Sequence, residues 1–291
     1  MLMVLPKFDY FSCKSVEEAC SLLSKYKGEA QVLAGGTDLL VKMKHKQMAP
    51  RYLINIKRVP DLNYIRHNED DGLQIGALTT IQAIKNSPLI KKKFSVLNQA
   101  ANVLGTRQVR NIATLGGNLC NASPAAECAP ALLTLETKAR ILGEHGERIV
   151  SLEKFFVGPG QTALKNDEIL TELQFPNLPV YTGGVYLKHS TRRIDVAIVG
   201  VAVVIALDGK MCQDIKIALG AVGPIPFRAK KAEDVLRGQE LNEELLERVA
   251  QAASDESFPI DDIRGDTDYR KSMVEILVKE EIKQAIAQAR L

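Results

Sequence analysis

Short apolar runs alternate with helical patterns at the start of the chain, which predicts a small unit of strands and helices. Residues 15–18 (Ser-Val-Glu-Glu) form a capping box that opens a helix running to about Tyr26. Residues 31–34 and 52–56 are apolar runs typical of buried strands, and residues 38–44 have helical spacing. We expect an N-terminal α/β unit over residues 1–57.

The next stretch mixes strand patterns with longer helical patterns, and we expect it to form a middle α+β unit over residues 58–176. A turn at Asp71-Gly72 joins the first two strands, and Pro176 ends the last one. The expected strands are residues 62–66, 73–77, 138–142, 148–152 and 169–175. The expected helices are residues 80–86, 87–104 and 125–135.

The pattern changes again after Asn177-Leu178-Pro179, where long apolar strands come first and helices follow. The expected strands are residues 185–189, 197–207 and 211–221, and the expected helices are residues 230–236, 243–254 and 269–289. We expect residues 177–291 to form an antiparallel sheet with helices, so that the whole chain has an α+β fold.

Two glycine pairs interrupt these patterns, and each follows a short apolar run. The first glycine segment is residues 32–38 (Val-Leu-Ala-Gly-Gly-Thr-Asp), and the second glycine segment is residues 112–118 (Ile-Ala-Thr-Leu-Gly-Gly-Asn). Glycine has no Cβ to hold a ligand away, and it lets successive backbone N–H groups converge on an anion. Two such segments predict a diphosphate held from two sides. Side chains that could add hydrogen bonds are Thr37, Thr114, Asn118 and Ser123.

Three ligands carry a suitable phosphate group: a nucleoside triphosphate, a nicotinamide dinucleotide and a flavin dinucleotide. A P-loop requires Gly-Lys-Ser/Thr, and neither glycine segment has the lysine. The dinucleotide fingerprint requires G-x-G-x-x-G, which Gly-Gly-Thr-Asp does not match. These absences favour a flavin dinucleotide.

Composition narrows the class of protein further. The 291 residues include 38 basic and 35 acidic side chains, a formal charge of +3 that gives no basic surface for nucleic acid. The longest apolar run, residues 196–207, is shorter than the roughly 20 residues of a membrane-spanning helix. The N-terminus lacks the apolar core of a secretion signal, so we expect a cytoplasmic protein. The five cysteines form no CxxC pair, and we expect no metal ligands.

The residues around both glycine pairs resemble a known family. Residues 34–40 (Ala-Gly-Gly-Thr-Asp-Leu-Leu), 114–118 (Thr-Leu-Gly-Gly-Asn) and 121–127 (Asn-Ala-Ser-Pro-Ala-Ala-Glu) resemble the FAD-binding subunits of molybdenum hydroxylases. That family includes the medium subunit of aerobic carbon monoxide dehydrogenase and the flavin domain of xanthine dehydrogenase. The resemblance covers essentially the whole chain, including residues 186–188 (Tyr-Leu-Lys) and 262–270.

The resemblance implies a vanillyl-alcohol-oxidase (PCMH) type FAD-binding fold, in which two α/β subunits surround FAD and an antiparallel sheet with helices follows. It implies that the pyrophosphate lies between residues 32–39 and residues 114–118. Leu104 would pack at the adenine end, Glu127 would reach a ribose or adenine group, and Leu170 would contact the flavin. The full set of implied cofactor-binding residues is Val32, Leu33, Ala34, Gly35, Gly36, Thr37, Asp38, Leu39, Leu104, Thr114, Leu115, Gly116, Gly117, Asn118, Ser123, Glu127, Leu170 and Lys188.

The resemblance also places Lys188 near the isoalloxazine ring. Reduced flavin gains negative charge, so a nearby ammonium raises its reduction potential. Without the resemblance, Lys188 reads as a strand-edge lysine in water. We expect non-covalent FAD, because His45, His67 and His145 lie away from the glycine segments and His189 points to the opposite strand face from Lys188. We expect no catalytic residues, since no hydrolytic motif is present.

As a function, the resemblance implies an electron-transfer subunit of an oxidoreductase complex. A large partner subunit would hold the molybdenum cofactor, and a small partner subunit would hold two [2Fe–2S] clusters. Electrons would pass through FAD to an external acceptor such as NAD, a quinone or another carrier. Two alternatives stay open: a stand-alone flavin oxidase or dehydrogenase of the same fold, and a partner-binding scaffold that has lost its flavin.

Overall fold

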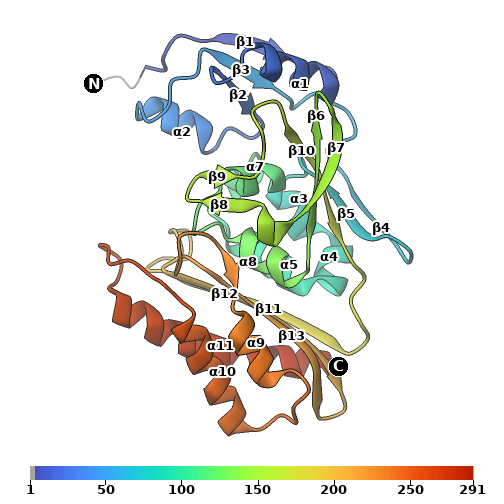
Figure 1. Cartoon of the computed structure of the whole chain (residues 1–291), viewed down its shortest axis with the longest axis vertical. Coiled ribbons are helices and arrows are strands. Elements are labelled where there is room, and N and C mark those ends of the chain that lie inside the picture. The colour runs from blue at the N-terminus through green and yellow to red at the C-terminus, as the bar shows by residue number, and fades with distance from the viewer. Residues whose placement is uncertain (1–3, 291) are drawn as a thin grey trace.

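The chain folds as three units that follow one another along the long axis of the molecule (Figure 1). The structure is a computed structural model, and it describes residues 4–290. The main sheets have the strand orders β1-β3-β2, β4-β5-β10-β6-β7 and β11-β12-β13-β14. This mixture of helices and sheets, with an antiparallel sheet and helices at the C-terminal end, confirms the expected α+β class.

The first sheet is parallel, and helices α1 and α2 connect its strands. Ser15 caps α1 by accepting a hydrogen bond from the backbone N–H of Glu18 at 3.1 Å, as the capping box predicts. The sequence pattern does not predict β1, because this edge strand is largely exposed and has no apolar face. The elements are β1 (Asp9–Ser12), α1 (Val16–Lys25), β2 (Ala30–Leu33), α2 (Leu39–Lys44) and β3 (Tyr52–Asn55).

The middle sheet is antiparallel, with β10 paired between β5 and β6. Its strands are β4 (Ile65–Asn68), β5 (Gly72–Gly76), β6 (Lys138–Gly143), β7 (Gly146–Ser151) and β10 (Ile169–Phe175), and a small hairpin is formed by β8 (Phe156–Gly158) and β9 (Gln161–Thr162). Its helices are α3 (Ile81–Asn86), α4 (Pro88–Lys93), α5 (Ser95–Val103), α6 (Arg107–Arg110), α7 (Leu115–Cys120), α8 (Cys128–Thr134) and the 3-10 turn η1 (Leu152–Lys154).

The single helix expected over residues 87–104 is wrong, because the chain forms two helices that meet at Phe94. Phe94 leaves the helical conformation, with φ −133° and ψ 53°. Its ring is buried against Phe175 of β10, with ring centroids 6.2 Å apart. The apolar spacing is continuous across the break, so periodicity alone does not show it. The break between α4 and α5 therefore coincides with the packing of the Phe94 ring against Phe175.

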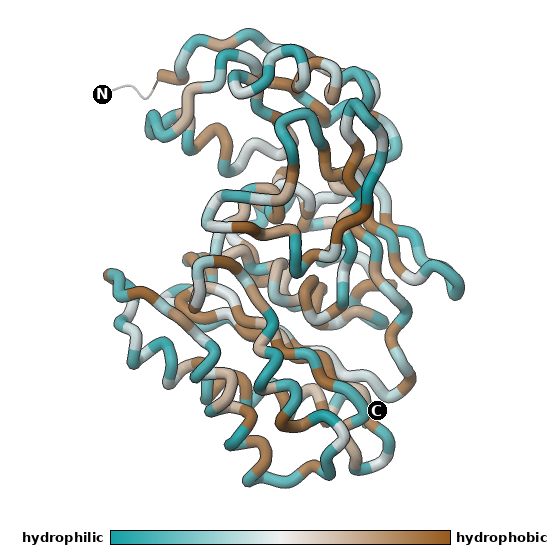
Figure 2. The backbone as a smooth tube through the Cα atoms, in the orientation of Figure 1, coloured by the Kyte–Doolittle hydropathy of each residue, from teal (hydrophilic) through white to brown (hydrophobic). Residues whose placement is uncertain are grey.

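The C-terminal sheet is covered on both faces, as Figure 1 shows for the layers around β12. Tyr186, Ala202 and Val204 pack into the core of the middle unit, whereas alternate residues pack under α10 and α11. Two buried faces explain why β12 is apolar along nearly its whole length (Figure 2). The elements are β11 (Thr182–His189), β12 (Val199–Asp208), β13 (Met211–Gly220), β14 (Phe227–Arg228), α9 (Lys230–Leu236), α10 (Glu243–Asp255) and α11 (Thr267–Ala289).

Strand β11 lies at the edge of this sheet, and side chains occupy its free side. The backbone N–H of Gly184 donates to Gln288 Oε1 at 3.3 Å, and that of Tyr186 donates to Gln99 Oε1 at 2.7 Å. The backbone N–H of Leu187 donates to Glu281 Oε1 at 3.0 Å. The edge is therefore satisfied by side chains from α5 and α11 rather than by another strand.

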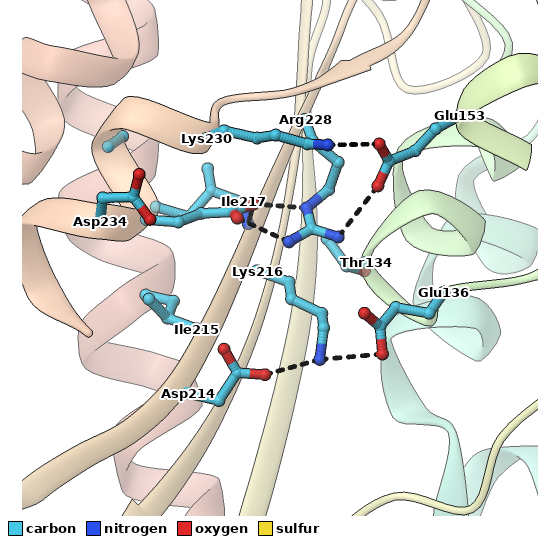
Figure 3. Close-up of polar contacts among 12 residues, drawn as sticks. Thr134, Glu136, Glu153, Asp214, Ile215, Lys216, Ile217, Arg228, Lys230 and Asp234 are labelled. Atoms are coloured by element: carbon cyan, nitrogen blue, oxygen red, sulfur yellow. Dashed lines mark hydrogen bonds and ion pairs between the residues drawn. The ribbon is translucent and has the colours of Figure 1, made fainter. Parts of the chain in front are cut away.

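Ion pairs join the C-terminal sheet to the middle unit at its other end (Figure 3). Glu153 lies 2.6 Å from the ammonium of Lys230 and 3.6 Å from the guanidinium of Arg228. Glu136 lies 3.2 Å from the ammonium of Lys216. Apolar packing and these pairs together fix the C-terminal unit against the middle unit. None of the helices within residues 4–290 is long and apolar enough to cross a bilayer.

Candidate cofactor-binding site

A cavity of about 850 Å³ lies between the first and middle units, and both glycine segments line it. Its volume is within the range of small-molecule and cofactor sites. Most of the residues expected to bind a cofactor line this cavity: Val32, Ala34, Gly35, Gly36, Thr37, Asp38, Leu39, Leu104, Thr114, Gly116, Gly117, Asn118, Glu127 and Leu170. The fold therefore brings both glycine segments and these residues to one cavity, and their contact with a cofactor stays a prediction.

Four expected residues do not line the cavity. Leu33 and Leu115 are buried in the core, whereas the residues before and after each of them line the cavity. The hydroxyl of Ser123 accepts a hydrogen bond from the backbone N–H of Ala125 at 3.3 Å. Lys188 lies just outside the cavity wall and binds protein groups. These four side chains therefore do not form part of the cavity wall.

The two glycine segments pack directly against each other. A Cβ atom added at Gly35 would lie 2.3 Å from the carbonyl oxygen of Ile112 in the second glycine segment. Gly36 has φ +76°, a conformation that side chains resist. Gly35 is thus needed for close approach of two backbones, and Gly36 for the turn that leads from β2 toward α2.

The second glycine segment contains the start of helix α7, which the sequence pattern does not predict. Thr114 caps α7 by accepting a hydrogen bond from the backbone N–H of Gly117 at 3.1 Å. Gly116 packs against Ala77, where an added Cβ would lie 2.8 Å from the Ala77 carbonyl oxygen. An added Cβ at Gly117 would lie 2.8 Å from the Thr114 hydroxyl, the one neighbour within 4 Å in residues 4–290. Of this pair, Gly116 is therefore held against backbone, whereas Gly117 is crowded by one side-chain hydroxyl.

Unused polar groups at the cavity fit a flavin dinucleotide. Within residues 4–290, the consecutive backbone N–H groups of Gly35, Gly36 and Thr37 donate to no protein acceptor. The side-chain oxygen of Asn118 is buried and has no hydrogen-bond partner in the same part of the chain. Buried polar groups are rarely left unpaired. Diphosphate oxygens would satisfy the N–H groups, and a sugar or ribityl hydroxyl would satisfy Asn118.

The cavity is also lined by polar residues that the sequence motifs do not identify. Lys42, one helical turn after Asp38, donates a hydrogen bond from its ammonium to Asn121 Oδ1 at 2.6 Å. Asn121 Nδ2 in turn donates to Asp38 Oδ1 at 3.1 Å. The i, i+4 spacing of Asp38 and Lys42 on a predicted helix is the signal that could have identified this pair. Lys165 lines another part of the wall and is exposed.

Lys188 is almost fully buried, which excludes its interpretation as a solvated strand-edge lysine. Its ammonium donates to the carbonyl oxygens of Val103 at 2.9 Å and Asp195 at 3.0 Å. It also lies 3.4 Å from Glu127 Oε1. Burial raises the pKa of the Glu127 carboxyl, while the Lys188 charge opposes that rise. All three ammonium protons therefore have acceptors within the protein.

The loop between β11 and β12 contributes two apolar side chains to the cavity wall. Ile194 and Val196 line the wall and are each about half exposed. Asp195, between them, turns its carbonyl toward Lys188. The ring of His189 lies 2.7 Å from the hydroxyl of Tyr269 and does not line the cavity. None of the histidines in the described chain lines it.

Comparison with known proteins identifies both parts of the chain. Residues 6–178 match the family described as FAD binding domain in molybdopterin dehydrogenase, and residues 185–285 match the CO dehydrogenase flavoprotein C-terminal domain. The chain is 34% identical to the glyceraldehyde dehydrogenase medium chain of Sulfolobus acidocaldarius, over 97% of this chain and 99% of the relative. It is 30% identical to the xanthine dehydrogenase FAD-binding subunit of Escherichia coli O157:H7, over 96% of both chains.

Among solved structures, carbon monoxide dehydrogenase from Hydrogenophaga pseudoflava superimposes with a TM-score of 0.95. Sequence identity in that match is 34%, and it covers 98% of this chain and 99% of the other. The similarity thus extends across all three units rather than over one motif.

Proposed function

The chain belongs to the family of FAD-binding subunits of molybdenum hydroxylases, and we propose that it carries electrons from the iron–sulfur clusters of a partner to an external acceptor. Relatives of this chain are subunits of oxidoreductases: carbon monoxide dehydrogenase, xanthine dehydrogenase and nicotine 6-hydroxylase. Bound FAD supplies reversible redox chemistry. The protein supplies binding, orientation and electrostatics.

The observation that supports this proposal most directly is the row of unpaired backbone N–H groups at Gly35, Gly36 and Thr37, beside the cavity. We assign these groups to the diphosphate. Gly117 leaves room for it on the opposite wall, and Asn118 accepts a hydrogen bond from a cofactor hydroxyl. Ile194 and Val196 reduce access of water to the far end of the cavity. Glu127, Leu104 and Leu170 also line the cavity.

The proposed partners are a large subunit with the molybdenum cofactor and a small subunit with two [2Fe–2S] clusters, in a cytoplasmic complex. Within residues 4–290, the side chains with metal-ligand spacing are Glu144, His145 and Asp167, and they include no cysteine. The cysteines are dispersed, and most are buried. This distribution supports a division of labour in which other chains hold the clusters. The acceptor is NAD, a quinone or another carrier.

The experiment compares the purified chain, loaded with FAD, with the same chain in its complete complex. We expect the chain alone to be reduced by dithionite and reoxidised by an acceptor without turning over any organic substrate. Substrate-driven flavin reduction should appear only with both partners present. Substrate turnover by the chain alone would instead establish the stand-alone oxidase or dehydrogenase.

Flavin content tests the remaining alternative and the mode of attachment. A chain that shows no flavin absorbance and takes up no added FAD would be a scaffold without flavin. We expect uptake, and we expect denaturation to release all of the FAD, because non-covalent binding leaves no bond to the protein. Flavin that stays with the denatured chain would overturn non-covalent attachment.

A further inference from the structure

A hydrogen-bonded chain of three side chains links the first unit to the middle unit at the cavity wall. The ammonium of Lys42, in α2, donates to Asn121 Oδ1 at 2.6 Å. Asn121 follows α7, and its amide donates to Asp38 Oδ1 at 3.1 Å. All three side chains line the cavity. Figure 1 shows that α2 and α7 belong to adjacent units.

Lys42 carries a positive charge that no carboxylate within residues 4–290 pairs with. No carboxylate in the described part of the chain lies within 4.0 Å of its ammonium. The hydrogen bond to Asn121 uses one ammonium proton, so two donors are left for another acceptor. Lys42 is half-buried at the cavity wall, whereas its neighbours Lys44 and Lys46 are exposed.

A diphosphate in this cavity would be repelled by a carboxylate on the same wall, and the ammonium of Lys42 would offset that repulsion. The Asp38 carboxylate lies in the first glycine segment and lines the same wall. A diphosphate brings further negative charge toward it, and backbone N–H groups supply dipoles but no net positive charge. A half-buried ammonium interacts with phosphate more strongly than an exposed one, because water and salt screen it less.

We propose that Lys42 neutralises the cofactor's diphosphate and makes the site prefer flavins that carry a diphosphate over riboflavin. Asn121 acts as a positioning residue, because it holds the ammonium with its oxygen and Asp38 with its nitrogen. This inference rests on the proposed function, since it assumes that the cavity receives FAD. It assigns to Lys42 a role separate from that of the glycine backbones.

The test measures dissociation constants of the full-length chain for FAD and for riboflavin by flavin fluorescence, with Lys42→Met as the variant. One charge-assisted hydrogen bond is worth roughly a 10- to 100-fold change in affinity. We expect a loss of that size for FAD and an unchanged affinity for riboflavin. Lys44→Met is the matched control, because Lys44 lies in the same helix, is exposed and does not line the cavity. It should bind both flavins like the wild type.

Salt dependence gives a second readout, and it also applies if riboflavin binds too weakly to measure. The affinity of the wild type for FAD should fall as salt rises, and Lys42→Met should flatten that dependence while Lys44→Met leaves it unchanged. Lys42→Arg keeps the charge and should restore much of the affinity. Asn121→Ala should weaken FAD binding less than Lys42→Met does.

Two results overturn the inference. One is an equal loss of FAD and riboflavin affinity in Lys42→Met, which would mean that Lys42 holds the two units in place. The other is an unchanged FAD affinity and salt dependence in that variant. Failure of the wild type to bind any flavin is a different result, because it would overturn the proposed function itself.

Discussion

The ammonium of Lys188 lies 3.4 Å from a carboxylate oxygen of Glu127, and only 2% and 13% of the two side chains are exposed. The same ammonium holds the carbonyl oxygens of Val103 and Asp195. Each of these partners is, or adjoins, a residue of the cavity wall. One buried cation therefore fixes the end of α5, the β11–β12 loop and the residue before α8 relative to one another.

Lys188→Met should make the reduction potential of the bound flavin more negative, because a positive charge near the cavity is lost. Glu127→Gln should shift it in the opposite direction, because a negative charge is lost while the lysine is kept. Both potentials are measured by redox titration of the FAD-loaded chain. Lys210→Met, at an exposed turn, is the control that should leave the potential unchanged. An unaltered potential in Lys188→Met would show that this lysine stabilises the cavity wall without affecting the flavin.

The free energy of unfolding separates the structural role of Lys188 from its effect on the flavin potential. Its removal leaves Glu127 and two carbonyl oxygens without their donor, so we expect a loss of about 3 kcal/mol in the free energy of unfolding. Chemical denaturation of the chain without FAD measures this term separately from the redox effect. A change of only a few tenths of a kcal/mol would contradict the tight packing of this cluster.

Gly35→Ala should reduce the stability of the chain, whereas Gly117→Val should mainly reduce its retention of FAD. The new methyl group at Gly35 would meet the carbonyl oxygen of Ile112, so we expect a loss of about 1–3 kcal/mol in stability even without cofactor. The side chain at Gly117 would crowd the Thr114 hydroxyl, 2.8 Å from the new Cβ, and would extend from there toward the cavity, so we expect loss of FAD retention with a smaller loss of stability than in Gly35→Ala. Flavin content and urea unfolding curves measure the two effects. Full flavin content in Gly117→Val would contradict a diphosphate at that wall.

Glu281 should give the chain a distinctive pH dependence. Its side chain is fully buried, and one of its oxygens has no hydrogen-bond partner within residues 4–290. Burial raises the pKa of its carboxyl well above the ordinary value of 4.5. The unfolded chain releases this proton at lower pH than the folded chain. Stability is therefore greatest below about pH 4.5 for this group and falls as pH rises toward the folded-state pKa, by at most about 1.4 kcal/mol per pH unit.

Glu281→Gln should make this decline shallower in urea unfolding experiments between about pH 5 and pH 8. Glu280→Gln is the matched control, because Glu280 is the adjacent exposed residue and should keep the wild-type slope. Parallel pH profiles for wild type and Glu281→Gln would show that the buried carboxyl is ionised in the folded chain.

The two cations that contact Glu153 should differ in their contribution to stability (Figure 3). Arg228 is 6% exposed and also pairs with the buried Glu233, whereas Lys230 is 62% exposed. Arg228→Met leaves a buried carboxylate short of its partner and should cost about 3 kcal/mol. Lys230→Met should cost less than about 1 kcal/mol. Thermal unfolding compares them, and equal losses would contradict the role assigned to burial.

The sequence predicts the elements that carry strong apolar periodicity. The strand-rich C-terminal unit follows from runs such as residues 199–207, and α1 follows from its capping box. The break at Phe94 depends on packing against Phe175, which is far away in the sequence. The helix at the second glycine segment is masked by two glycines, which are poor helix formers. The boundaries at residues 57 and 176 stay predictions.

The candidate site was predictable where its residues cluster in a motif. Both glycine segments, Leu104, Glu127 and Leu170 lie at one cavity, and their contacts with FAD stay predictions. Lys42 and the apolar pair Ile194 and Val196 carry no motif of their own, and only folding brings them to that wall. Lys188 was expected beside the ring, but its three protein acceptors become visible only once α5 and the β11–β12 loop are in place.

The side chains along β11 have a consequence for how this chain can associate with other chains. An exposed strand edge is a template on which a second molecule can add a strand, and this is a common route to aggregation and domain swapping. Here Gln99, Gln288 and Glu281 already occupy backbone donors of that edge. These side chains therefore oppose the addition of a strand by a second molecule at β11, and they favour association of this chain through side-chain surfaces elsewhere.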